Sequence, residues 1–161
     1  MPIIGAGLPQ PTHVATNEAL MRRALALLVD SDGHDVRPAD CQADVPVAAL
    51  IVDPQGRIVA EAVNRREADG DPTAHAEVLA LRAAAKIVGD GWRLEGCELV
   101  VTLEPCAMCA AAISAARIGR LYYGAEDARM GGVRHGARVF DHPQCHHRPQ
   151  VYDGIGADPA R

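Results

Sequence analysis

The chain has 161 residues, of which 48% are hydrophobic and 23% charged, and this composition predicts one soluble, globular domain with a sizeable core. No apolar run approaches the roughly 18 residues of a membrane helix, and residues 1–12 lack the basic start and long apolar run of a signal peptide, so we expect a cytoplasmic protein that does not enter membranes. The formal net charge of -5 argues against a general nucleic-acid binder.

The N-terminal quarter predicts an arm, a helix and a loop. Residues 1–15 carry Gly and Pro without a period, so we expect a flexible N-terminal arm. A single domain is expected to follow over residues 16–161. An apolar stripe at helical spacing predicts a helix over residues 17–29, and residues 31–44 are polar and predict a loop.

The middle of the chain predicts a hairpin followed by a helix. Two apolar runs, residues 45–52 and 58–63, flank a Pro-Gly turn and predict two antiparallel strands. A stretch rich in Ala and Leu predicts a helix over residues 74–88. Asp71 or Thr73 is a candidate cap for the start of this helix.

The C-terminal half predicts two more strands and one more helix. Residues 98–103 form a strand-like run, and Pro105 is well placed to open a helix that extends to about residue 116. A brief strand is expected over residues 121–124, with mostly loop from residue 127 onward. The order helix, strand, strand, helix, strand, helix, strand predicts an α/β fold with one sheet and helices on its faces.

Positive charge is concentrated in one segment despite the acidic total. Residues 117–148 contain six arginines against three acidic residues, an excess of three positive charges, with four histidines besides. A local basic stripe can bind phosphates even on an acidic protein. The arginines are Arg117, Arg120, Arg129, Arg134, Arg138 and Arg148.

Two short segments carry the candidate chemistry, and each is predicted to lie where a helix begins. One contains His75 and Glu77, and the other contains Pro105, Cys106 and Cys109. Two cysteines three positions apart project to the same side of a helical turn and can reach one ion. Zinc accepts two thiolates and one imidazole, and three protein ligands leave the fourth position open, as in catalytic zinc sites. We therefore predict one zinc ion per subunit, held by His75, Cys106 and Cys109.

Glu77 is the candidate catalytic acid and base. It lies two residues after His75, near the start of the same predicted helix. At this offset its carboxylate can lean toward a water molecule at the metal without being a ligand. It can then take a proton from the water and return it to a leaving nitrogen. The predicted reaction is hydrolytic loss of ammonia from an amidine-like ring carbon.

Other interpretations of these residues stay open at this point. A structural zinc site would need a fourth protein ligand, for which Cys97 is the nearest candidate. A Cys-x-x-Cys pair can also be a redox pair, and a zinc-binding module without catalysis is a third possibility. Cys145 with the histidines at positions 135, 142, 146 and 147 could form a second metal site, although loop histidines near phosphates or an interface explain them as well.

Several motifs together resemble those of the bacterial tRNA-specific adenosine deaminases. The pattern H-x-E…P-C-x-x-C is the signature of zinc-dependent deaminases of nucleobases. The resemblance runs from about residue 17 to residue 158. The matching pieces are Val45-Pro46-Val47, Asn64-Arg65, Asp71 to Glu77, Trp92-Arg93-Leu94, Val101 to Cys106, Arg117 to Arg120, and His147-Arg148-Pro149.

The resemblance implies a fold and a reaction. The fold would be the cytidine-deaminase-like three-layer α/β/α sandwich with a central mixed sheet. The activity would be hydrolytic conversion of adenosine to inosine at the wobble position of tRNA. The partners would be the tRNA anticodon loop and a second copy of the chain in a homodimer.

The resemblance also implies a set of site residues. His75, Cys106 and Cys109 match the metal ligands, and Glu77 matches the proton shuttle. The substrate-binding positions would be Asn64, Ala76, Pro105, Ala125 and Asp127.

The chain departs from this family in ways that keep an alternative open. Ala48 stands where the family often has glycine, and the loop of residues 31–44 is longer than usual. The C-terminal helix that touches tRNA in the family is expected to be missing or reduced to a stub. The alternative function is therefore deamination of a free base or nucleoside, of the guanine or cytosine type.

Overall fold

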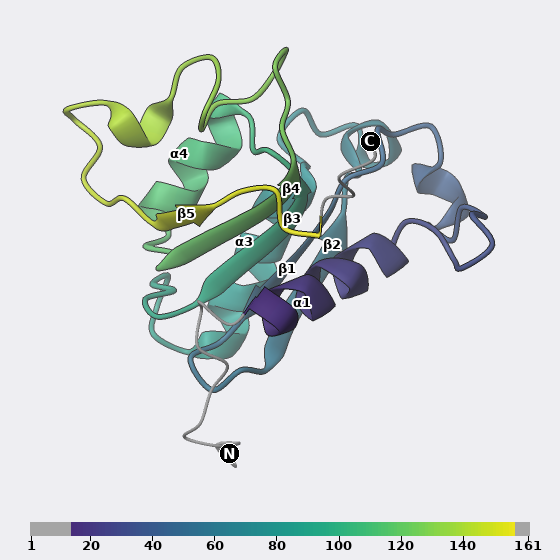
Figure 1. The fold of residues 1–161 in the computed structure, drawn as a ribbon, viewed down its shortest axis with the longest axis horizontal. Helices are drawn as coiled ribbons and strands as arrows, with labels where there is room; N and C mark the ends of the chain where they lie inside the picture. The colour runs from purple at the N-terminus through teal and green to yellow at the C-terminus, as the bar shows by residue number, and fades with distance from the viewer. Residues whose placement is uncertain (1–13, 157–161) are drawn as a thin grey trace.

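A computed structural model describes residues 14–156 of the chain, with side chains from Asn17 onward. It has three layers, in which helix α1 covers one face of a sheet and helices α3 and α4 cover the other (Figure 1). This arrangement is the α/β/α sandwich that the sequence predicts. The elements are α1 (Val14–Ala26), η1 (Ala39–Cys41), β1 (Ala48–Val52), β2 (Ile58–Val63), α2 (Arg66–Asp69), α3 (Ala76–Val88), β3 (Glu98–Leu103), α4 (Ala107–Ala115), β4 (Arg120–Ala125), η2 (Val139–Asp141) and β5 (Gln150–Tyr152).

The sheet has five strands in the order β2-β1-β3-β4-β5 and mixes both kinds of pairing. Strand β1 pairs antiparallel with β2 and with β3, whereas β3, β4 and β5 run parallel. The start of β1 and the ends of β2, β3 and β4 therefore meet at one edge of the sheet.

Alternate residues of the strands build two separate cores, because successive side chains of a strand point to opposite faces. Ala49 and Ile51 of β1 pack in the core beneath α3 and α4. Ala48, Leu50 and Val52 pack in the core beneath α1. With both faces covered, β1 is buried along its whole length, which explains its continuous apolar sequence.

The predicted elements are confirmed with shifted ends. The predicted strands over residues 58–63 and 98–103 match β2 and β3 in full. Helix α1 begins at Val14 and ends at Ala26, so the predicted end at residue 29 is wrong. The chain turns early because the Asp30 carboxylate accepts hydrogen bonds from the backbone N–H groups of Asp32 and His34 and stabilises a turn there.

The predicted arm lies mostly outside the described residues, and both predicted long loops contain short regular elements. Residues 1–13 of the predicted arm lie outside the described residues, whereas Val14 and Ala15, also predicted as arm, belong to α1. The predicted loop of residues 31–44 contains the short helix η1, and the predicted loop after residue 127 contains η2 and β5. Among the helices of the described residues, none is both long and apolar enough to span a bilayer.

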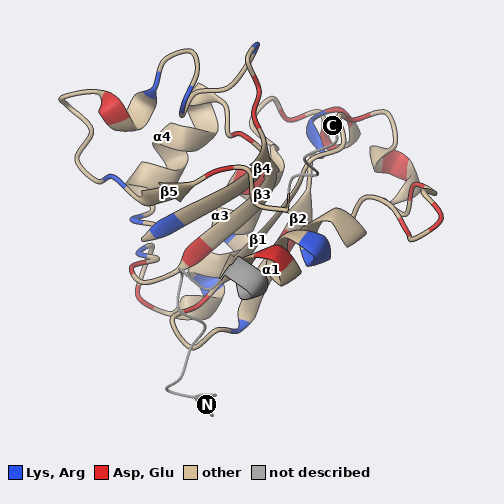
Figure 2. Ribbon diagram, in the orientation of Figure 1, with Lys and Arg blue, Asp and Glu red and all other residues tan. Residues whose placement is uncertain are grey.

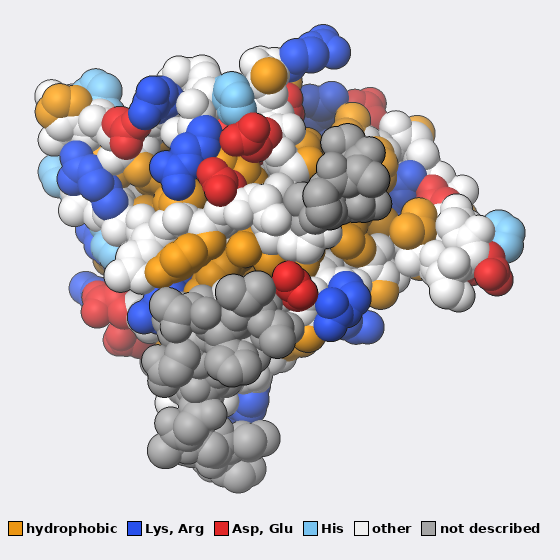
Figure 3. Space-filling model, viewed as in Figure 1, with side chains coloured by type: hydrophobic (Ala, Val, Ile, Leu, Met, Phe, Trp, Pro, Cys, Tyr) orange, Lys and Arg blue, Asp and Glu red, His pale blue; other side chains and the backbone are white. Residues whose placement is uncertain are grey.

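The arginine-rich segment is largely engaged in contacts within the chain. Arg134 lies 3.2 Å from Asp153, Arg138 lies 2.8 Å from Asp141, and Arg120 lies 3.7 Å from a carboxylate of β3. Acidic and basic residues accordingly alternate over this part of the molecule (Figure 2). On the face shown in Figure 3, blue and red side chains are intermixed rather than forming one continuous basic surface.

Candidate zinc site and substrate pocket

The candidate metal ligands lie at the starts of two helices. His75 is the N-terminal cap residue of α3, and Cys106 is that of α4, both with extended backbone. Cys109 follows in the first turn of α4 and is completely buried. The predicted cap of α3 by Asp71 or Thr73 is wrong, because the Asp71 carboxylate instead accepts hydrogen bonds from Thr73 in a turn before the helix.

The three ligand atoms are spaced as zinc requires. The Nδ1 atom of His75 lies 3.6 Å from Sγ of Cys106 and 3.5 Å from Sγ of Cys109. In tetrahedral coordination, with Zn–S of about 2.3 Å and Zn–N of about 2.0–2.1 Å, sulfur and nitrogen would be about 3.6 Å apart. The residues present therefore fit a zinc ion, and this group of converging ligand atoms consists of His75, Cys106 and Cys109; the other such group among the described residues, Asp30, Asp32 and His34, is exposed.

The thiols are disposed to bind a cation. The pKa of Cys106 falls to about 5, chiefly because the Cys109 thiol donates a hydrogen bond to the Cys106 thiolate. Burial opposes this shift but does not cancel it. The pKa of Cys109 is raised, because this hydrogen bond favours its protonated form and because it is buried. A second thiolate is therefore costly in this pocket until a positive ion compensates the charge.

Glu77 lies in the first turn of α3 and is 5% exposed. Burial raises the pKa of its carboxyl group to about 7. A group with a pKa near neutrality can both accept and release a proton at cellular pH. The sequence-based assignment of Glu77 as proton shuttle thus has a physical basis in its position.

A pocket of about 330 Å³ opens beside these residues at the sheet edge described above. Five of the sequence-predicted site residues that are not thiols line it: Asn64, His75, Ala76, Glu77 and Asp127. The full lining is Val45, Val47, Asn64, Arg66, His75, Ala76, Glu77, Leu103, Glu104, Cys106, Asp127 and Met130.

Two predicted substrate-binding residues lie outside this lining. Pro105 is buried and does not line the pocket. Ala125 lines a separate cavity of about 350 Å³ between α1 and β4. It lies at the last position of β4, whereas Asp127, two residues later, reaches the pocket.

Sequence reasoning missed the apolar rim of the pocket. Val45 and Met130 line it and are 58% and 67% exposed, although large apolar side chains are usually buried. Met130 stands alone in a loop sequence, so no helical or strand periodicity of apolar residues indicates that it lines a pocket. The loop after β4 folds back toward α4 and so places Met130 at the pocket.

Asn64 has a local role besides its place in the pocket. Its side-chain amide donates a hydrogen bond to the carbonyl oxygen of Val45, and its side-chain oxygen accepts one from the N–H of Arg66. These bonds hold the end of β2 beside the segment that leads into β1. The side chain is thereby fixed at the pocket wall, where it can exchange one of these bonds for a substrate.

The competing interpretations of the cysteines and histidines find no support in the described residues. Cys97 is buried and does not belong to the ligand group. None of the five cysteines forms a disulfide. His135 and His147 contact a carboxylate and a backbone carbonyl respectively, and no metal-ligand group among the residues described contains them.

Asp44, which is distant in the sequence, stabilises the pocket wall that follows Asn64. This buried carboxylate accepts hydrogen bonds from the backbone N–H groups of Glu67 (2.6 Å) and Ala68 (3.1 Å). These two N–H groups belong to the first turn of α2 and have no acceptor within the helix. The N-terminal cap residue of α2, Arg65, provides no side-chain hydrogen bond to them. The polar loop before β1 therefore caps the short helix at the pocket mouth.

Changing Asp44 to alanine is expected to lower the free energy of unfolding by about 1–3 kcal/mol, because two N–H groups lose their acceptor. Urea unfolding measures this loss. Asp32→Ala is the matched control, since Asp32 is exposed in the same loop. Equal effects of the two substitutions would contradict the capping role.

Comparisons with known proteins agree with the geometry. Residues 15–125 match the family model of the cytidine and deoxycytidylate deaminase zinc-binding region. The tRNA-specific adenosine deaminase of Agrobacterium fabrum is 50% identical over 121 residues, which are 75% of this chain and 78% of that protein.

Two solved structures are also similar. One, from a study of A-to-I editing by tRNA:A34 deaminases, is 51% identical with a TM-score of 0.65, covering 68% of this chain and 78% of the other. Guanine deaminase from Bacillus subtilis is 37% identical with a TM-score of 0.55, covering 68% and 64% respectively. The chain therefore belongs to the cytidine and deoxycytidylate deaminase family, in the branch of the tRNA-specific adenosine deaminases.

Proposed function

We propose that this protein is a zinc-dependent hydrolase that converts adenosine to inosine at the wobble position of tRNA. The observation that carries the proposal is the buried carboxylate of Glu77 in one pocket with His75 and Cys106, next to Cys109. The similarity to a tRNA-specific adenosine deaminase supports the substrate. Residues 16–161 would form a single deaminase domain.

The residues of the pocket divide the work of the reaction. Bound zinc supplies Lewis-acid chemistry that makes a water molecule nucleophilic at neutral pH. Glu77 would take one proton from that water and deliver it to the ring nitrogen beside the carbon under attack. It would then take the second proton of the same water from the new C–OH group and pass it to the amino group, which leaves as ammonia. Adenosine and water thus give inosine and ammonia.

The pocket walls would bind the base. Asn64, Ala76 and Asp127 line the pocket and are the proposed substrate contacts. Pro105 would act by supporting Cys106, and Ala125 by setting the path of the chain into Asp127. A pocket of about 330 Å³ holds little more than one nucleoside, so the base must leave its stack to enter, which is easiest in the single-stranded anticodon loop.

A synthetic anticodon stem-loop tests this proposal. Zinc-loaded protein would be incubated with an arginine-tRNA stem-loop and, in parallel, with free adenosine, guanine and cytosine. Inosine at the wobble position with ammonia release is the expected result. Deamination of a free base without any reaction on the stem-loop would overturn it.

Deamination of a free base is the second candidate. It is favoured by the similarity to guanine deaminase and by the net charge of -5. Several arginines of the basic segment are neutralised by acidic neighbours, which leaves less positive charge for RNA. Arg129 is exposed in the segment between the pocket residues Asp127 and Met130, forms no ion pair with another described residue, and favours the polynucleotide.

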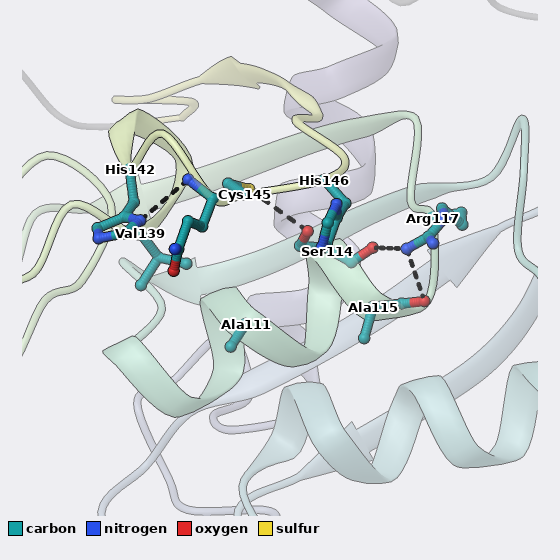
Figure 4. A pocket seen from close by; sticks show the side chains of 9 residues that line it. Ala111, Ser114, Ala115, Arg117, Val139, His142, Cys145 and His146 are labelled. Carbon is teal, nitrogen blue, oxygen red and sulfur yellow. Dashed lines mark hydrogen bonds between the residues drawn. The ribbon is translucent and has the colours of Figure 1, made fainter.

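We also propose a homodimer that works in the cytoplasm. The outward face of α4 carries Ala111 and Ala115, both exposed, beside a cavity of about 450 Å³ (Figure 4). A second copy of the chain could pack there, because small side chains allow close approach of another backbone. Sedimentation should give a dimer for the natural chain and a monomer for Ala115→Arg. A monomer in both cases would exclude the homodimer.

A further inference from the structure

The carboxylate of Glu104 accepts five hydrogen bonds from one loop. Its Oε1 atom accepts bonds from the N–H of Asp127 (3.1 Å) and from Nδ1 of His135 (2.7 Å). Its Oε2 atom accepts bonds from the N–H groups of Val133 (3.1 Å), Arg134 (2.9 Å) and His135 (3.1 Å). The side chain is fully buried between the end of β3 and this loop.

Besides these bonds, the loop of residues 126–135 is held by the ion pair of Arg134 with Asp153 and by two ties to the metal-binding segment. Most of its side chains are exposed, and Val133 is the one large apolar side chain of the loop that is buried among the residues described. The two ties to the metal-binding segment are made by backbone groups. The N–H of Gly132 donates to the carbonyl oxygen of Pro105 (2.8 Å), and Gly131 forms a β-bridge with Cys106.

The loop packs so closely against Glu104 and the start of α4 that only glycine fits at two of its positions. A Cβ atom on Gly132 would collide with the backbone of Ala107, and one on Gly131 would collide with the Glu104 carboxylate. The loop therefore lies directly against the start of α4, with its backbone N–H groups aimed at one buried acceptor. A carboxylate suits this place because it offers only acceptors to a cluster of donors.

The same loop forms a wall of the pocket. Asp127 and Met130 line it on one side, and Cys106 lines it from the metal-binding segment. We propose that Glu104 is a positioning residue, which fixes the loop of residues 126–135 against the start of α4 and so sets the distance between the substrate wall and the metal ligand. The activity part of this inference rests on the proposed function.

Glu104→Gln tests the inference with Glu98→Gln as its matched control. Both glutamates are buried, Glu104 directly after the last residue of β3 and Glu98 at its first residue, beside Tyr122 and Arg120. Glutamine keeps the size of the side chain and turns an NH₂ group toward the donors. Hydrogen exchange of the loop N–H groups of Asp127 and Val133 should be at least about tenfold faster in Glu104→Gln and unchanged in Glu98→Gln.

The kinetic readout separates positioning from folding. On the anticodon stem-loop, Glu104→Gln should raise KM by about tenfold or more with a smaller change in kcat, while zinc content stays at one per chain. Glu98→Gln should keep both constants close to those of the natural chain. Glu104→Asp, which retains both oxygens, should recover part of the loss and replaces the glutamine variant if that variant does not fold.

Three results would overturn the inference. One is unchanged exchange of the loop in Glu104→Gln. Another is loss of zinc in parallel with faster exchange, because Glu104 would then support the metal segment itself. The third is faster exchange with an unchanged KM. If the natural chain does not act on the stem-loop, the proposed function fails, and the exchange and zinc measurements still decide whether Glu104 fixes the loop.

Discussion

Replacing Glu77 by glutamine should abolish turnover while leaving zinc bound. Removing a positioned general acid and base costs about 10²–10⁴-fold in rate. Glutamine has nearly the same size, so the buried position next to Cys109 should stay filled and the ligands undisturbed. Ammonia release on the anticodon stem-loop measures the rate, and elemental analysis measures zinc per chain.

The control for this experiment is Glu95→Gln, the same chemical change at an exposed position. It should retain the rate of the natural chain. Appreciable turnover by Glu77→Gln would contradict the mechanism. Loss of zinc in that variant would instead make Glu77 part of the metal site.

Removing the metal is expected to have the second large effect. Chelation should abolish activity and lower the thermal midpoint. A ligand present at a thousand times its Kd stabilises the folded state by about 4 kcal/mol, which corresponds to roughly 10 °C for a domain of this size. Zinc added back should restore both. Activity that persists without metal would contradict zinc as the cofactor.

Two cysteine substitutions resolve which thiols bind the ion. Cys109→Ala removes one of three ligands, so zinc affinity should fall by more than the roughly 10–100-fold that follows loss of a supporting hydrogen bond. Cys97→Ala makes the same change at another fully buried thiol that lies outside the ligand group. It should cost stability and leave zinc affinity intact. Equal loss of zinc in both would mean that Cys97 is a ligand.

The candidate metal ligands and Glu77 could be predicted from sequence because each pair lies within one helical turn. Cys106 and Cys109 lie on one helical turn, and His75 and Glu77 lie at the start of another, so spacing alone indicates which side chains converge. The strands over residues 48–52 and 98–103 were predictable because burial on both faces requires a continuous apolar run.

The distant part of the site could not be predicted in this way. Asp44 caps a helix 23 positions away, and Glu104 binds a loop 23 to 31 positions away. A buried acidic residue in a sequence shows neither its burial nor its partner. Strand β5 was missed because three residues are too few for a pattern, and it forms through pairing with β4.

The spacing of the three ligands has a consequence for the unfolded chain. Cys106 and Cys109 lie 31 and 34 positions after His75. An ion held by all three therefore acts as a cross-link that closes a loop of that length, which contains α3 and β3. In the chain-entropy model, a covalent cross-link over such a loop disfavours the unfolded state by about 3–4 kcal/mol. Bound zinc would thus link the start of α3 to the start of α4, and its loss should expose α3 and β3 together to proteases.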